Sequence, residues 1–355
     1  MIPRASSHSA AQGTGPVQAW LFAVAGLVAL TAIVGAATRL TGSGLSITEW
    51  NVIGGVVPPL DDAQWAVAFE KYKQIPQYRE INRGMSLDAF KTIFWWEWGH
   101  RMLARGIGLA FALPLVLFAL LGRLPPGCLP RLLALLGLGA RQGFVGWYMV
   151  SSGLVDRTDV SQYRLALHLG LAVLIFAFLI WTALDLRSVR DRQAIDLQTI
   201  TRGGRRSAHA LAGLVYLQVL AGALVAGLKA GKSYNTWPLM DGGIVPDGLL
   251  QMSPWWRNLF ENVALVQFNH RMLAYAIVVW SVLHAVALVQ TADSPRVRTT
   301  AVAVAAVMLG QTLLGIWTLL AWVPLSLGVA HQAGALIAVA VAVTHLHAVR
   351  GATRS

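Results

Sequence analysis

The chain has 355 residues, of which 56% are hydrophobic and 12% are charged, so it carries about half the charged fraction of a soluble domain. Its formal net charge of +12 does not indicate a nucleic-acid-binding surface, because the basic residues lie between long apolar segments. A single cysteine, Cys128, excludes an intrachain disulfide and any metal site built from several cysteines. The composition therefore predicts a polytopic membrane protein surrounded by the lipid bilayer.

We predict an all-α fold with eight transmembrane helices, each formed by about 20 mostly apolar residues. The N-terminal tail has one arginine and no apolar segment of its own, so it resembles neither a cleaved signal nor a transit peptide. In chain order, the predicted spans lie near residues 19–40, 93–121, 132–151, 164–184, 208–228, 262–289, 300–321 and 325–346.

The distribution of arginine predicts the orientation of these spans. Arginines gather in the two termini and in the connections after the second, fourth and sixth spans, where few acids oppose them: Asp185, Asp191, Asp196 and Asp293. By the positive-inside rule, both termini are cytoplasmic. The long loops, near residues 41–92 and 229–261, then face the outside.

The second and sixth spans begin with nearly the same octapeptide. Residues 97–104 read EWGHRMLA, and residues 267–274 read QFNHRMLA. The stretch His-Arg-Met-Leu-Ala is identical, but Glu97 of the first copy is replaced by the amide Gln267 in the second. This pattern indicates a duplicated functional segment that keeps its carboxylate in one copy only.

The duplication extends well beyond the octapeptides. Residues 35–59 align without gaps with residues 222–246, with identical glycine, serine, tryptophan and proline positions. The two halves are residues 1–190 and 205–355, with four helices each. Because an even number of helices keeps both copies in the same orientation, we predict two tandem four-helix bundles related by a pseudo-twofold axis along the membrane normal.

Four histidines lie a turn or two inside the outer ends of the even-numbered spans: His100, His168, His270 and His331. An ionisable group at such depth is costly and usually faces the bundle interior or a cofactor. Two imidazoles from facing helices suit the two axial positions of a metal macrocycle. Zinc would need further ligands that the second half does not offer. We therefore predict one haem in each half, with these histidines as ligands of the haem iron.

Several polar residues near these histidines are candidates to bind a haem propionate or to support a ligand. Arg101 and Arg271 directly follow two of the histidines, and arginine binds carboxylates in a bidentate manner. The alternative is that both arginines snorkel to the outer headgroups. The third span of each half adds further candidates: Arg141, Gln142 and Gln311.

Glu97 lies three residues before His100 and so on the same face of the helix. We expect it to point toward whatever His100 binds, which makes it a candidate proton donor or acceptor. Gln267 cannot exchange a proton in the working range. The difference predicts that the chemistry takes place in the first half and that the second half holds a fixed cofactor.

The remaining histidines are assigned to structure. His284, deep in the sixth span, is predicted to be a core histidine with its hydrogen bonds satisfied. The others lie in the N-terminal tail or at the cytoplasmic ends of spans and are predicted to be solvated or interfacial: His8, His209, His345 and His347.

Taken together, these residues resemble the haem A synthase family over nearly the whole chain. The resemblance rests on Glu-x-x-His-Arg in the second span, the His-Arg repeat in the sixth, and a histidine in each of the fourth and eighth spans. It also includes the loop TRLTGSGLSITEWNVIGGVVPP at residues 38–59 and the loop AGKSYNTWPLMDGGIVP at residues 230–246. Some family members carry a cysteine pair in the first outer loop of each half, so this chain resembles the subgroup without those pairs.

The resemblance implies that His270 and His331 hold a haem b cofactor, while His100 and His168 flank the site of the substrate, haem O. Glu97 matches the family's essential acid. The implied reaction oxidises the C8 methyl group of haem O to a formyl group by successive hydroxylations, with loss of water from the geminal diol. The product, haem A, serves terminal oxidases.

The resemblance also implies a location and partners. The protein would lie in the bacterial inner membrane, with the haem sites toward the periplasmic side. Haem O synthase, cytochrome oxidase assembly factors and an unidentified electron donor would be its partners, and a homo-oligomer is compatible with the sequence.

Two other functions compete with this one. A dihaem b-type electron-transfer protein that oxidises quinol would hold two permanent haems, but it has little need of Glu97 opposite Gln267, or of Arg141 opposite Gly310. A transporter built from parallel repeats would typically bind near the midplane of the membrane, whereas these histidines lie toward the outer surface.

Overall fold

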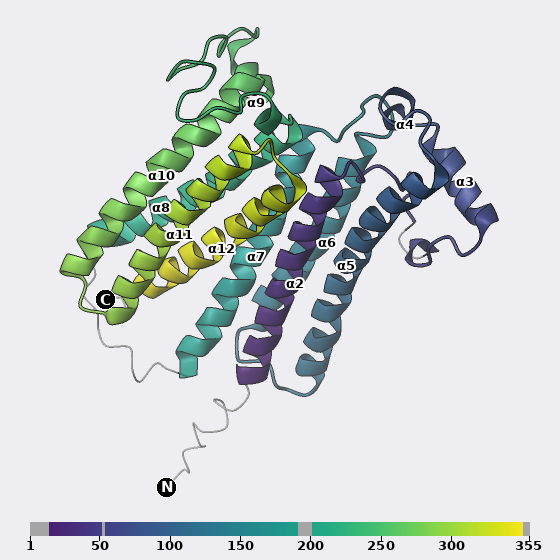
Figure 1. The fold of residues 1–355 in the computed structure, drawn as a ribbon. Coiled ribbons are helices and arrows are strands. Elements are labelled where there is room, and N and C mark those ends of the chain that lie inside the picture. Colours follow the sequence, from purple (N-terminus) through teal and green to yellow (C-terminus); the bar gives the residue numbers. More distant parts are fainter. Residues whose placement is uncertain (1–13, 52–53, 191–200, 351–355) are drawn as a thin grey trace.

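The computed structural model describes residues 14–51, 54–190 and 201–350. Within these ranges the regular structure is helical, apart from one isolated bridge between Met240 and Gly243. Eight helices in the described part have 23 or more residues and lie side by side (Figure 1). They are α2 (Thr14–Leu40), α5 (Leu87–Leu120), α6 (Leu129–Ser151), α7 (Gln162–Arg190), α8 (Arg202–Gly227), α10 (Val263–Thr291), α11 (Pro295–Leu320) and α12 (Leu325–Val349).

Seven of these helices, all except α6, are long and apolar enough to cross a membrane, which confirms a multi-pass membrane protein. The expected span at residues 132–151 is present as the helix α6, which packs beside α5 and α7. Its 23 residues are sufficient for a bilayer. Its composition is less apolar because it contains Arg131, Arg141 and Gln142.

The long helices contact one another in two rings. In the first, α2, α5, α6 and α7 each pack against the next, and α7 returns to α2. In the second, α8, α10, α11 and α12 do the same, and α12 returns to α8. The rings meet where α7 packs against α8 and where α12 packs against α2 and α7. The contact between α5 and α6 is less extensive than that between α10 and α11, so the first ring is the more open one.

The short segments gather at one end of the bundle, opposite the start of α2 and the end of α12 (Figure 1). After α2 come η1 (Gly54–Val56), α3 (Asp62–Tyr72) and α4 (Pro76–Glu80), and after α8 come η2 (Ala230–Lys232), η3 (Trp255–Arg257) and α9 (Asn258–Glu261). The helices α5, α7, α10 and α12 all begin at this end, so the residues in their first turns lie at related depths.

A separate aromatic cluster fastens the segment between α2 and α5 to the first turns of α5. Phe90 is fully buried and lies 5.0 Å from the ring of Phe69 and 5.2 Å from the ring of Tyr72, measured between ring centroids. The Tyr72 hydroxyl is 2.9 Å from Gln77 Oε1. These contacts dock α3 and α4 against the first turns of α5, before the octapeptide begins.

The opposite end of the bundle contains a buried histidine pair. His284 of α10 and His345 of α12 approach with their Nε2 atoms 2.8 Å apart, and His345 Nδ1 lies 2.9 Å from the hydroxyl of Thr300. The prediction of a satisfied core histidine at position 284 is confirmed. The prediction of a solvated or interfacial His345 is wrong, because this residue is 2% exposed.

His347 is also buried, so its predicted solvation is wrong too; its Nε2 lies 3.2 Å from a carboxylate oxygen of Asp185. The reason for both errors is that α12 packs against α2, α7, α8 and α11, so polar residues near its end find their partners inside the bundle. His209 is exposed, as expected, and its Nδ1 lies 2.8 Å from the carbonyl of Arg205. His8 lies outside the described residues.

We expect Phe90→Ala to destabilise the segment between α2 and α5 by about 3–5 kcal/mol, because it removes a buried aromatic ring from the cluster. Thermal unfolding of the purified protein, followed by tryptophan fluorescence, measures this loss, since Trp65 lies 6.4 Å from Phe90. Phe178→Ala is the control, because Phe178 is 50% exposed on α7. An equal shift of the unfolding temperature in both variants would contradict the assignment.

Candidate functional site

The four histidines predicted as ligands lie in four long helices, two in each ring; three are within the first two or three turns, and His100 lies further along, after the extra N-terminal turns of α5. His100 is in α5, His168 in α7, His270 in α10 and His331 in α12. All four residues are partly exposed. His100 is within electrostatic range of His168, and His331 is within range of His270. The structure therefore places the two histidines of each predicted pair in the same ring of helices.

A glycine on the preceding long helix faces the edge of each imidazole. A Cβ atom added to any of these glycines would lie only 2.7–3.1 Å from the Cε1 atom of the histidine. The pairs are Gly35 with His100, Gly146 with His168, Gly222 with His270 and Gly315 with His331. Larger residues at these positions would push the rings away from the helix backbone.

Gln142 and Gln311, which were predicted to support the ligands, each contact one histidine. The Nε2 atom of Gln142 donates a hydrogen bond to the backbone carbonyl of His168 (3.0 Å) and lies 3.1 Å from its Nδ1. Gln311 makes the same two contacts to His331, at 2.8 and 3.1 Å. Each glutamine thus bonds to the backbone of a histidine on the next helix and places its amide against the ring of that histidine.

A third glutamine has this geometry and was not predicted from the sequence. Gln218 of α8 donates to the backbone carbonyl of His270 (3.0 Å) and lies 3.1 Å from its Nδ1. A sequence signal was available, because Gln218 precedes Gly222 by four residues, the same spacing that links Gln142 to Gly146.

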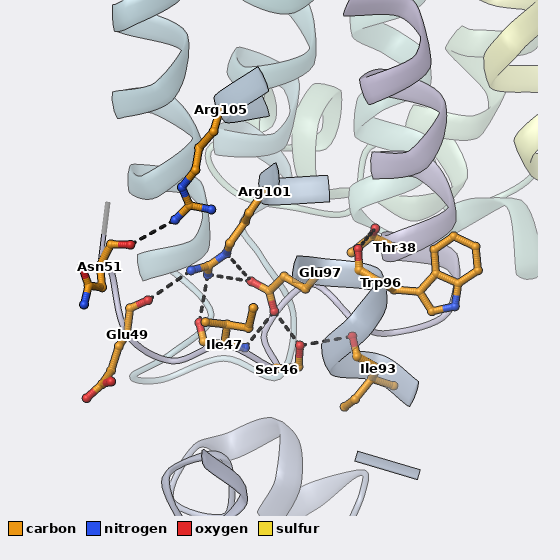
Figure 2. Close-up of polar contacts among 10 residues, drawn as sticks. All are labelled: Thr38, Ser46, Ile47, Glu49, Asn51, Ile93, Trp96, Glu97, Arg101 and Arg105. Atoms are coloured by element: carbon orange, nitrogen blue, oxygen red, sulfur yellow. Dashed lines mark hydrogen bonds and ion pairs between the residues drawn. The ribbon is translucent and has the colours of Figure 1, made fainter. Parts of the chain in front are cut away.

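Glu97 and Arg101 fasten the loop after α2 to α5 (Figure 2). Glu97 is 2% exposed, and its Oε2 accepts hydrogen bonds from the Ser46 hydroxyl and the Ile47 backbone N–H, both at 2.8 Å. Its Oε1 accepts from Arg101 Nη2 (2.6 Å) and Nε (3.1 Å). Arg101 also donates to the carbonyls of Ile47 (2.9 Å) and Glu49 (3.1 Å). We call this set the first latch.

The second half repeats the arrangement with an amide. Gln267 is 2% exposed; its Nε2 donates to the Ala230 carbonyl (2.7 Å), and its Oε1 accepts from Arg271 Nη2 (2.9 Å). Arg271 also donates to the carbonyls of Tyr234 (2.7 Å) and Thr236 (2.9 Å). In the repeat alignment these are the positions of the two carbonyls that Arg101 binds. We call this set the second latch.

The hydrogen bonds of the two latches bear on the roles predicted for the arginines and for Glu97. Both arginines bind loop carbonyls, and Arg271 Nε remains a buried donor without a hydrogen bond in the described part of the chain. The bonds of the Glu97 carboxylate run to Arg101 and to the loop, so its predicted proton transfer at His100 stays a prediction. Arg141 is exposed and lies about 100° round α6 from Gln142, so it is not on the face that contacts His168.

The donor set at these histidines fits a metal-centred ring. Within the described ranges, no three His, Cys, Asp or Glu side chains come together as a metal site. An iron held by two imidazoles must therefore take its remaining ligands from a macrocycle. The imidazoles are partly exposed between helices whose glycines keep the backbone close, which leaves them accessible to a flat ring.

These features define a multi-pass helical membrane protein with paired, braced histidines toward one end of the bundle. Residues 18–343 match the model of a family described as cytochrome oxidase assembly protein. The heme A synthase of Parvibaculum lavamentivorans is 52% identical over 328 residues, or 92% of each chain. That of Brucella anthropi is 51% identical over 337 residues, covering 95% of this chain and 92% of the relative. That of Brucella ovis is 48% identical over 362 residues, or 99% of both.

The chain therefore belongs to the haem A synthase family of cytochrome oxidase assembly proteins. The resemblance inferred from the sequence is confirmed, and the comparisons give no support to the dihaem electron-transfer alternative.

We expect Glu97→Ala to lower the free energy of unfolding by about 3–5 kcal/mol, because it removes the buried carboxylate and leaves the partly buried Arg101 guanidinium without its ion pair. Gln267→Ala removes no ion pair, only the hydrogen bond to the Ala230 carbonyl and the one from Arg271, and should cost about 1–3 kcal/mol. Thermal unfolding of the two purified variants gives the comparison. Equal losses would show that the ion pair of the first latch adds nothing to the amide arrangement of the second.

Proposed function

We propose that this protein is a haem A synthase, which oxidises the C8 methyl group of haem O to a formyl group by successive hydroxylations. The haem A produced would serve terminal oxidases. Family membership over nearly the whole chain supports this activity. The observation that carries it is the presence of one histidine pair in each ring of helices, which suits one substrate ring and one cofactor ring.

The two halves have different roles in this proposal. His100 and His168 bind the iron of haem O, and His270 and His331 bind the iron of a haem b cofactor. The more open contact between α5 and α6 supports an exchangeable ligand in the first half, whereas the tighter α10–α11 contact supports a fixed one in the second. Haem b, when bound, supplies an iron centre that can relay electrons from an external donor.

Glu97 is the proposed proton donor or acceptor. The equivalent position in the second half is Gln267, whose amide cannot exchange a proton in the working range. Through the first latch, Glu97 also fixes the loop that carries Trp50, whose ring lies 5.5 Å from the Arg101 guanidinium carbon. Arg101 and Arg271 are the proposed propionate partners. The unpaired Nε of Arg271 supports this assignment in the second half.

We further propose that α6 also crosses the membrane, which brings the number of spans to eight. The units 1–190 and 205–355 would then be duplicated four-helix bundles related by a pseudo-twofold axis along the membrane normal. The two rings of helix contacts and the matching latches support this arrangement. In the bacterial inner membrane, both termini would then be cytoplasmic and the histidine pairs would lie toward the periplasm. Haem O synthase and the oxidase assembly factors are the proposed partners.

The activity is tested by extracting haems from cells that lack this chain and from cells that express it. We expect haem O to accumulate in its absence and haem A to form only in its presence, as measured by mass analysis of the pigments. Glu97→Gln should lower haem A formation by at least about 100-fold, the smallest usual effect of losing a proton-transfer group. Gln267→Glu is the matched exchange in the second half.

Haem A in cells without the chain would refute the proposed activity. Normal haem A formation by correctly folded Glu97→Gln protein would instead refute only the role of the carboxylate.

The assignment of the halves predicts opposite effects for the two histidine pairs. His270→Ala and His331→Ala should lose the bound haem b from the purified protein, as seen in its absorption spectrum. His100→Ala should keep haem b but fail to convert haem O, because it removes a ligand of the substrate only. His209→Ala is the control, since His209 is exposed. Retention of haem b by both second-half variants would overturn the assignment.

A further inference from the structure

Three of the four paired histidines share a support that the fourth lacks. On α6, α8 and α11, a glutamine stands four residues before the glycine that faces the imidazole. Each of these glutamines donates to the backbone carbonyl of its histidine at 2.8–3.0 Å. Each also places the same nitrogen 3.1 Å from Nδ1 of the ring. We call this arrangement the amide clamp.

The clamp holds the ring as well as the backbone. In His168 and His270 the amide nitrogen lies 3.1 Å from Nδ1 and within 3.5 Å of Nε2. Because one atom is close to both ring nitrogens, the amide lies against the ring instead of capping a single nitrogen. The glycine opposes the ring at Cε1. Rotation of the imidazole must therefore displace a hydrogen-bonded amide from between two helices.

His100 has the glycine but not the amide. Gly35 faces its Cε1, and four residues earlier α2 carries Thr31 in place of glutamine. The Thr31 hydroxyl donates back to the Leu27 carbonyl of its own helix (2.8 Å). The backbone of Thr31 approaches the His100 ring, yet His100 Nδ1 is buried and makes no hydrogen bond within the described residues.

We propose that the amide clamps make Gln142, Gln218 and Gln311 positioning residues, and that Thr31 leaves His100 as the one axial ligand able to swing off the iron. Residues that brace a ligating histidine commonly alter metal affinity or activity by about 10–100-fold. A labile ligand in the first half and two clamped ligands in the second match an exchangeable substrate and a permanent cofactor. This inference rests on the proposed function.

Carbon monoxide binding to the reduced, haem-loaded protein tests the proposal. A six-coordinate ferrous haem binds carbon monoxide only after an axial histidine leaves, so the rate reports the release of that histidine. We expect a fast phase from the first half and a slow phase from the second. Gln218→Thr should speed the slow phase about tenfold, and Thr31→Gln should slow the fast phase by a similar factor.

Gln18→Thr is the matched control, because Gln18 donates to the Ala183 carbonyl between α2 and α7 (2.9 Å) without touching a histidine. It should leave both phases unchanged. If Thr31→Gln does not fold, Gln218→Thr decides alone. A slow phase that Gln218→Thr leaves unaltered overturns the clamp, and so does an equal acceleration by Gln18→Thr.

The same preparations separate this proposal from the proposed function. If His270→Ala abolishes haem b binding but Gln218→Thr binds carbon monoxide at the wild-type rate, only the clamp fails. If His270→Ala and His331→Ala both keep the haem b spectrum, the ligands themselves are misassigned and the clamp fails with them.

Discussion

A polar side chain within an apolar helix bundle must find its hydrogen-bond partners inside the protein, and much of this structure follows from that constraint. At one end of the bundle, His284 and His345 satisfy each other, with Thr300 completing the chain of contacts. Toward the other end, glutamines on neighbouring helices hold three of the four paired histidines. The same bonds also fix the positions of adjacent helices.

The duplication is preserved in detail where it concerns the backbone. Arg101 and Arg271 bind carbonyls at the same aligned loop positions, and a glycine faces each of the four imidazoles. Two departures from the repeat, by contrast, lie close to His100. Glu97 stands in place of an amide, and Thr31 stands in place of a clamping glutamine. Both changes alter polar contacts while leaving the helices in place, so they modify one site without changing the fold.

Much of this arrangement could be predicted from the sequence, because hydropathy and repeated motifs are local properties. The long helices, the glutamine support of His168 and His331, and the contrast between Glu97 and Gln267 were found in this way. Contacts between segments that are distant in the sequence could not be predicted from such local properties. Nothing local shows that Glu97 binds the backbone of Ile47, or that His345 near a helix end faces a buried partner. Gln218 was not predicted, although it precedes Gly222 by the same four residues that separate Gln142 from Gly146. A glutamine on an apolar helix can serve helix packing or support a ligand, and only the neighbouring residue in the structure decides between these roles.

The two latches also differ in charge, which bears on the division of labour. Glu97 and glutamine are nearly the same size, so the exchange of one for the other changes charge more than packing. In the first latch the carboxylate neutralises Arg101, and in the second Arg271 keeps its positive charge and an unpaired Nε. A net cation attracts the anionic propionates of a haem more strongly than a neutral ion pair does. Under the proposed function, this difference favours retention of the ring in the second half and its release from the first.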